Sequence, residues 1–119
     1  MGSFTIEVKG ADKLITKFEN MSRKMEKEVK NSVKKRTFEM EAKAKKFAPY
    51  DTGHLKRSIG STFYNRGLSG EISTNVKYAI FVEKGTRFMS AQPYFFPAFL
   101  VTRSNFIRDL NRIMKDVVD

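Results

Sequence analysis

The sequence predicts an α+β domain in which a small antiparallel sheet, made of an N-terminal strand and a β-hairpin, packs against a long N-terminal helix and a C-terminal helix. Alternating apolar and polar residues near the N-terminus and after residue 58 indicate the strands. Apolar residues three and four positions apart along two long stretches indicate amphipathic helices. The chain has 119 residues, 40% of them hydrophobic, and residues 1–119 contain no linker or internal repeat, which favours a single domain with one core.

The N-terminal part is predicted to be a short strand followed by a long helix. Residues 4–8 alternate as in a strand with one buried face, and Gly10 ends this pattern. The helix is expected from about Asp12, its N-cap, to Phe47, because Pro49 disfavours the helical conformation at the residue before it. Its core-facing side chains are expected to be Leu14, Phe18, Met21, Met25, Val29, Val33, Met40, Ala44 and Phe47.

A β-hairpin is predicted after the turn that follows this helix. Residues 59–63 alternate again, residues 65–70 contain the Asn and Gly typical of a hairpin loop, and residues 71–76 form the return strand. Residues 78–82 fit either a short helical turn closed by Gly85 or a further strand, and the local pattern favours neither.

A second long helix is predicted to run nearly to the C-terminus, with Pro97 in its first turn. Its apolar face is expected to contain Phe99, Phe106, Ile107, Leu110, Ile113, Met114 and Val117. The aromatic stretch of residues 94–99 is too crowded for every ring to enter one small core. About half of its rings are expected in the core and the others to be buried only against another subunit. The candidate interface residues are Phe88, Met89, Tyr94, Phe95 and Phe96.

Charge and composition limit the classes of partner. The chain carries 23 Lys and Arg against 13 Asp and Glu, a formal net charge of +10, which favours attraction to nucleic acid or to an acidic protein surface. Glutamates interrupt the lysines of the first helix, so charge alone does not separate a solvated face from a non-specific contact with DNA. No apolar run reaches the roughly 20 residues that cross a bilayer, so we expect a soluble protein with no membrane partner.

Few side chains indicate chemistry. The chain has no cysteine, and His54, its only histidine, follows a glycine and is expected to be an exposed turn residue. Glu83 is expected to pair with an arginine such as Arg57 or Arg87. The glycine patterns that bind phosphates are absent. The sequence therefore predicts no enzyme activity, no cofactor or metal and no small-molecule substrate.

The remaining glycines, prolines and polar residues between the predicted elements are interpreted as residues that form structural turns. Asp51 is expected to accept hydrogen bonds from the backbone of Thr52 and Gly53, with Gly53 supplying a backbone angle that a β-branched residue resists. The complete set of predicted structural turn residues is Pro49, Asp51, Thr52, Gly53, Glu83, Gly85, Thr86, Pro93 and Pro97.

Three segments in fixed order resemble one family of phage proteins. Residues 48–59, APYDTGHLKRSI, resemble the family pattern APxDTGxLRxSI, residues 78–86 resemble YAxxVExGT, and residues 92–98 resemble QPFxxPA. Together they are similar to the HK97 gene product 10-like family, described as tail components or head-tail joining proteins. The sequence departs from these patterns mildly, at Lys56, Lys84 and Tyr94.

The resemblance implies a virion protein that acts in tail completion or neck assembly, made in the host cytoplasm and then built into the head-tail junction. It also implies a ring of copies around the DNA channel, in contact with neighbouring neck and tail proteins. Two other functions stay open from the sequence: a tail terminator of the same class, and a stand-alone basic nucleic-acid-binding or ribonuclease-like protein.

Overall fold

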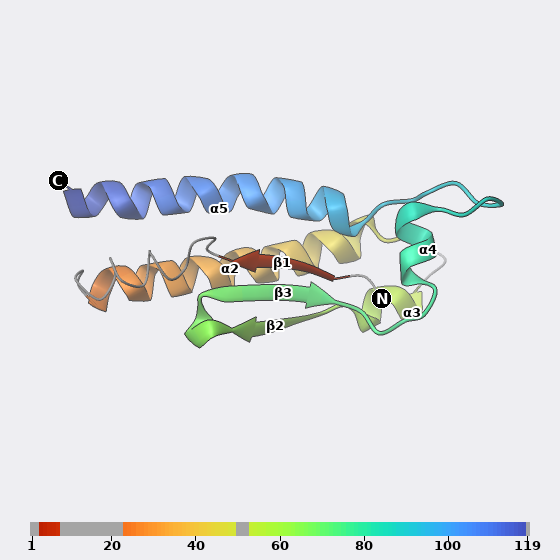
Figure 1. Ribbon diagram of the computed structural model, residues 1–119, viewed down its shortest axis with the longest axis horizontal. Coiled ribbons are helices and arrows are strands. Elements are labelled where there is room, and N and C mark those ends of the chain that lie inside the picture. The colour runs from red at the N-terminus through yellow and green to blue at the C-terminus, as the bar shows by residue number, and fades with distance from the viewer. Residues whose placement is uncertain (1–2, 8–22, 50–52, 119) are drawn as a thin grey trace.

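Two long helices lie side by side against a small sheet in the computed structural model, which describes residues 3–7, 23–49 and 53–118. Figure 1 shows α2 (Arg23–Phe47) and α5 (Phe95–Val118) running in opposite directions. The molecule is elongated, with extents of 54 × 22 × 21 Å. This is the predicted α+β arrangement.

The sheet contains β1 (Ser3–Glu7), β2 (Gly60–Tyr64) and β3 (Ser69–Ser73), in the spatial order β1-β3-β2. Both pairings are antiparallel, so the N-terminal strand adds to the free edge of the hairpin, as predicted. α2 packs against this sheet so closely that a Cβ at Gly70 of β3 would lie 1.9 Å from the hydroxyl of Thr37 on α2. A glycine is therefore needed where strand and helix meet.

The hairpin loop is shorter than predicted. Asn65 and Arg66 have φ of 53° and 59°, and Gly67 has φ of 88°, so three successive left-handed residues reverse the chain. Asn and Gly tolerate this conformation best. The return strand consequently begins at Ser69 and ends at Ser73, whereas residues 71–76 were expected.

The buried face of α2 follows the predicted spacing. Met25, Val29, Val33, Met40 and Ala44 are buried, as expected. Phe47, the last residue of the helix, is 40% exposed, so its prediction as a core residue is wrong. The expected core residues Leu14, Phe18 and Met21, with Val8, Gly10 and Asp12, lie outside the described residues, as does the side chain of Val117.

The buried face of α5 differs from the predicted one. Ile107 and Met114 are exposed, whereas Thr102 and Asp109 are buried. The physical reason is that Asp109 binds Ser32 and Arg36 of α2, so the face of α5 that meets α2 includes polar residues and does not follow the apolar spacing alone. Phe106 and Ile113 are buried as predicted.

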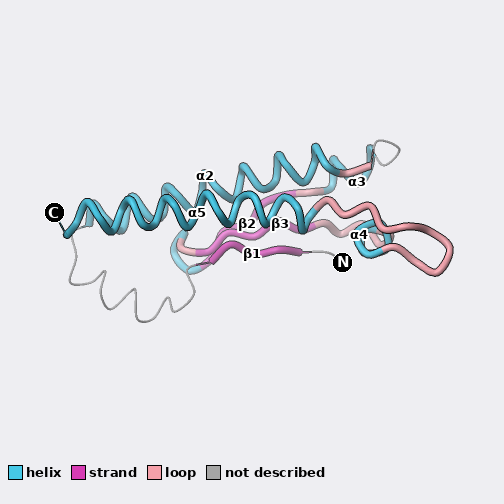
Figure 2. Tube along the Cα trace, turned by 90° about the horizontal axis from the view of Figure 1, so that it is seen from above, coloured by secondary structure: helices cyan, strands magenta, loops and turns pink. Residues whose placement is uncertain are grey.

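Two short helices link these layers: α3 (Gly53–Ser58) and α4 (Ala79–Lys84). Residues 79–84 are thus helical, and the N–H of Gly85 donates to the carbonyl of Phe81 at 2.7 Å to close α4. Of the two structures that the sequence left open for residues 78–82, the helical turn is confirmed. Figure 2 shows that the connection from α4 to α5 extends beyond the end of the helix pair.

Candidate assembly site

Glu83 joins α4 to the start of α5. Its Oε1 accepts hydrogen bonds from the backbone N–H groups of Tyr94 at 3.0 Å and Phe95 at 2.8 Å, and its Oε2 accepts one from Phe96 at 3.1 Å. The first N–H groups of a helix lack partners within the helix, and a negative charge is stabilised there by the helix dipole. Glu83 therefore caps α5 from another helix, and Pro97, which has no N–H, needs no such partner.

The predicted ion pair of Glu83 with Arg57 or Arg87 is wrong: in the described part of the chain the Glu83 carboxylate makes no ion pair and accepts hydrogen bonds from the α5 backbone instead. The sequence contained a signal for the correct contact. The residue before α5 is Tyr94, which has no side chain suited to an N-cap, and Glu83 is the only carboxylate between Glu71 and Asp109. A helix start that lacks its own capping side chain, with a single carboxylate in the preceding segment, is a signal in the sequence for this contact.

Tyr94 and Phe95 belong to the core, so their prediction as interface residues is corrected. Both side chains are buried within a single copy of the chain, and their ring centroids lie 4.7 Å apart. The hydroxyl of Tyr94 donates to the carbonyl of Ala79 at 3.1 Å. The contacts of α4 with the first turn of α5 thus bury two of the five candidate interface residues, whereas Phe88, Met89 and Phe96 stay exposed.

The burial of Tyr94 predicts that the folded chain loses stability at high pH. Burial, and then the charge of Glu83, raise the pKa of Tyr94 from 10.0 to about 12. Because the folded pKa is above the unfolded one, the stabilisation is complete below pH 10 and is lost as the pH rises through 12. We expect the free energy of unfolding to fall by roughly 2 kcal/mol in this window from Tyr94 alone. Urea denaturation across this range should show a smaller fall in Tyr94→Phe, whereas equal falls would contradict the assignment.

The residues from Gly85 to Pro93 form a projecting connection that we call the arm. Thr86 and Met89 pair across it, with Thr86 N to Met89 O at 2.8 Å and Met89 N to Thr86 O at 3.3 Å. The hydroxyl of Thr86 also accepts from Phe88 N at 3.1 Å. At the base, Gln92 N donates to the carbonyl of Val82 on α4 at 2.8 Å. The arm is therefore a hydrogen-bonded turn fixed to α4.

Gly85 allows the arm to leave α4. Its φ and ψ are 76° and 175°, a combination that residues with a Cβ rarely adopt. A Cβ would also lie 2.6 Å from Ala91 N and 2.9 Å from Met89 O. Gly85 is thus a structural turn residue, as predicted, and Pro93 ends the arm directly before Tyr94.

Gly85→Ala should disturb the arm more than the rest of the fold. We expect a loss of about 1 to 3 kcal/mol in the free energy of unfolding, from the unfavourable backbone angle and the overlap with Ala91. Limited proteolysis should cut the variant faster within the arm. Gly60→Ala is a matched control, because a Cβ at Gly60 meets nothing within 4 Å and that residue does not have positive φ. Equal behaviour of the two variants would contradict this account.

The outcome differs among the other predicted turn residues. Asp51 and Thr52 lie outside the described residues. Gly53 is the first residue of α3 and does not have positive φ, so the prediction that it supplies a special backbone angle is wrong. Pro49 follows the end of α2, where Ala48 N still donates to the carbonyl of Ala44 at 2.9 Å. His54 is exposed, within α3.

A polar network that the sequence pattern does not predict joins α2 to α5. Arg36 on α2 binds Asp109 on α5 through one edge of its guanidinium, with Nε to Oδ2 at 2.6 Å and Nη2 to Oδ1 at 3.0 Å. Ser32 donates to the same carboxylate at 2.9 Å. Glu39 accepts from Arg36 and, at 2.7 Å, from Asn105. The hydrogen bonds from Arg36 lower the pKa of Asp109 below its usual value, against the effect of burial.

A pocket of about 300 Å³ lies beside this network and is lined by Glu28, Asn31, Ser32, Lys35, Asp109, Arg112 and Ile113. Two acidic and two basic side chains line it, so the lining gives a charged ligand no net attraction. In the described part of the chain, no three His, Asp or Glu side chains gather where they could hold a metal ion.

Comparison with known proteins identifies the family. A family model described as "Bacteriophage HK97-gp10, putative tail-component" matches residues 12–85, which is more than half of the chain and includes Glu83 and Gly85. No curated protein and no solved structure matches the chain. Among the described helices, none is long and apolar enough to cross a membrane. The chain therefore belongs to the HK97-gp10-like family of bacteriophage tail components.

Proposed function

We propose that the chain is a structural virion protein of a tailed bacteriophage or prophage that acts, without catalysis, at the head-tail junction during tail completion or neck assembly. It is made in the host cytoplasm, joins a ring of its own copies and contacts neighbouring neck and tail proteins. Family membership supports the structural role in the phage. The observation that carries the assembly role is the arm, which is fixed at its base by Glu83 and Gly85 and holds Phe88 outward with 90% of its surface exposed.

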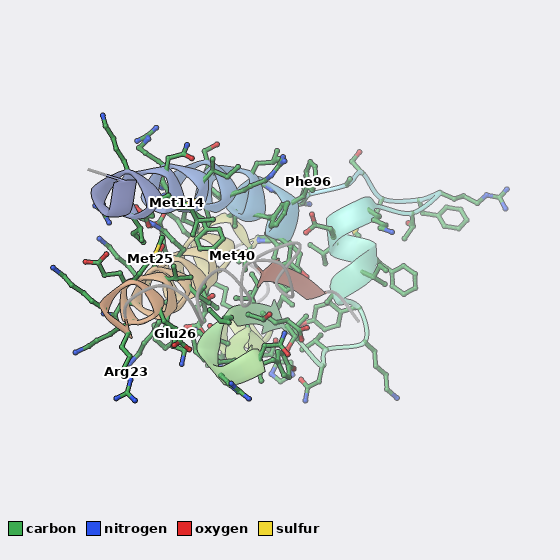
Figure 3. The ribbon with its side chains drawn as sticks, turned by 60° about the vertical axis from the view of Figure 1, so that its left-hand side comes forward. Arg23, Met25, Glu26, Met40, Phe96 and Met114 are labelled. Atoms are coloured by element: carbon green, nitrogen blue, oxygen red, sulfur yellow. The ribbon has the colours of Figure 1, made fainter. Side chains whose placement is uncertain are left out.

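A second exposed surface supports association between copies. Phe96, Leu100, Ile107 and Met114 are all exposed, and their spacing places them on one face of α5. Figure 3 shows Phe96 at the α4 end of this helix and Met114 toward its other end. These four side chains share the face with the exposed Arg103, and their apolar contact would help a chain of net charge +10 to overcome repulsion between its copies.

Removing the gene tests the proposal. A phage or prophage that lacks the chain should produce filled heads and tails of normal length that do not join, visible by electron microscopy, and the wild-type gene supplied in trans should restore joined particles. Tails of irregular length would instead identify the chain as the tail terminator. Normal infectious particles without the chain would contradict both roles.

The alternative of a stand-alone nucleic-acid-binding protein rests on the net charge. It predicts tight, sequence-independent binding of DNA or RNA at physiological salt that falls steeply as salt rises. Under the junction role, we expect the purified chain to bind DNA only weakly at that salt. A contact between the lysines of α2 and the DNA channel would occur in the assembled particle.

A further inference from the structure

The arm presents an aromatic side chain that the fold itself does not use. Phe88 is 90% exposed, more than any other large hydrophobic side chain in the described part of the chain. Figures 1 and 2 both show the α4–α5 connection extending beyond the end of the helix pair. An exposed Phe costs solubility, and a ring that is 90% exposed gains little from packing within its own chain, so its position is useful mainly to a partner.

The arm is organised before any partner binds. The Thr86–Met89 pairing and the hydrogen bond from Phe88 N to the Thr86 hydroxyl define the turn. The guanidinium carbon of Arg87 lies 5.5 Å from the centroid of the Phe88 ring, so the two side chains are presented together. A preformed turn loses little conformational entropy when it binds, and Phe and Arg are side chains that often dominate interface energies.

The charge around Phe88 restricts the partner. Lys84 and Arg87 are exposed and positive, and the nearest carboxylate in the sequence, Glu83, is occupied by the backbone of α5. A matching surface therefore needs an apolar recess for Phe88 and carboxylates at its rim.

A second copy of the chain is a poor match for these requirements. Its net charge is +10. Several of its described carboxylates already bind cations within the chain: Glu26 with Lys30, Glu41 with Lys45, and Asp109 with Arg36. Its described pocket is lined mainly by polar and charged side chains. Charge complementarity thus favours a different protein.

We propose that the arm docks, through Phe88 and Arg87, into an apolar pocket with an acidic rim on a different protein of the phage particle. This proposal rests on the proposed function and names the chemistry of one of its partners. The exposed row on α5 is left for contacts between copies, so the two surfaces bind two kinds of neighbour.

Site-specific crosslinking tests the proposal. Phe88 is replaced by the photoreactive p-benzoylphenylalanine in the phage that encodes the chain, assembled particles are irradiated, and the joined peptides are mapped by mass spectrometry. We expect position 88 to join one other virion protein, at a segment that contains apolar and acidic residues. The same replacement at Tyr64, an exposed aromatic residue at the turn of the β2–β3 hairpin, is the control and should not join that segment.

The outcomes separate this proposal from the function on which it rests. A crosslink to a second copy of the chain, a crosslink to DNA, or no crosslink from particles that contain the chain would overturn the docking proposal and leave the junction role intact. Particles that never contain the chain would overturn both.

A second test measures the affinity of the chain for the virion protein that crosslinking has identified, purified on its own. Phe88→Ala should weaken binding by about 30-fold, as for a central interface aromatic residue. Arg87→Gln should reduce the dependence of the affinity on salt, because it removes a cation from the acidic rim. Both side chains are exposed, so both variants should melt like the wild type. Unchanged affinity of Phe88→Ala would show that the arm is not the docking element.

Discussion

Glu83→Ala is expected to lower the free energy of unfolding by about 3 kcal/mol, because the carboxylate accepts three backbone N–H groups that α5 cannot satisfy itself. Tyr94 and Phe95 are buried, so water cannot easily replace the carboxylate at their N–H groups, whereas Phe96 is half-exposed and its N–H loses less. Urea denaturation followed by circular dichroism measures the loss. The arm should also become more sensitive to protease, since its end at Pro93 lies next to the cap.

Two variants of the same helix serve as controls for this cap. Glu83→Gln keeps an acceptor oxygen but removes the charge, so it should lose about half as much stability as Glu83→Ala. Lys84→Ala changes the exposed neighbouring residue and should stay within about 0.5 kcal/mol of the wild type. If Glu83→Ala were no less stable than Lys84→Ala, the cap would not be a stabilising contact.

Asp109→Ala is expected to cost about 3 to 4 kcal/mol, because it leaves the partly buried guanidinium of Arg36 without its main partner. The double variant Arg36→Met with Asp109→Leu should recover most of this loss, since two apolar side chains of similar size can replace a buried ion pair. A double-mutant cycle on thermal and urea unfolding measures the coupling. Additive losses from Arg36→Met and Asp109→Leu would mean that the two residues do not act as a pair.

The same pair makes the free energy of unfolding depend on pH in the acidic range. The pKa of Asp109 in the folded chain lies below its ordinary value of 3.8, so its contribution is present above about pH 4 and is lost as the pH falls through the folded pKa. Asp109→Asn should therefore have a smaller fall in stability below pH 4 than the wild type. Parallel pH profiles for the two proteins would contradict this assignment.

The fold was predictable from the sequence because its elements depend on local patterns. Alternation in residues 59–63 and the three-and-four spacing along α2 reflect which side of a strand or helix meets the core, and that is a property of neighbours in the sequence. The start of the return strand was missed by two residues, since Asn65 and Arg66 both adopt left-handed angles that the pattern of apolar residues does not encode.

The candidate site was less predictable because it depends on contacts between distant residues. Phe88 and Phe95 are the same residue type, seven positions apart, yet one is 90% exposed and the other is buried. The difference comes from Glu83, which fixes the start of α5 against α4, and this contact crosses more than ten residues of chain. The burial of Asp109 could not be predicted for the same reason. Its carboxylate can enter the core because Arg36, 73 residues earlier in the chain, lies opposite to it.

The Arg36–Asp109 network also sets how far α5 lies along α2. A slide of one turn, about 5.4 Å, would bring a different set of side chains into register between two antiparallel helices. A bidentate ion pair with fixed geometry does not tolerate that displacement, because a shift by one turn would leave both charges without partners. Since the arm is attached to the first turn of α5, this pair acts together with the Glu83 cap in holding Phe88 at a fixed position relative to the helix pair. In the proposed ring, every copy would therefore hold its arm in the same position relative to its helix pair.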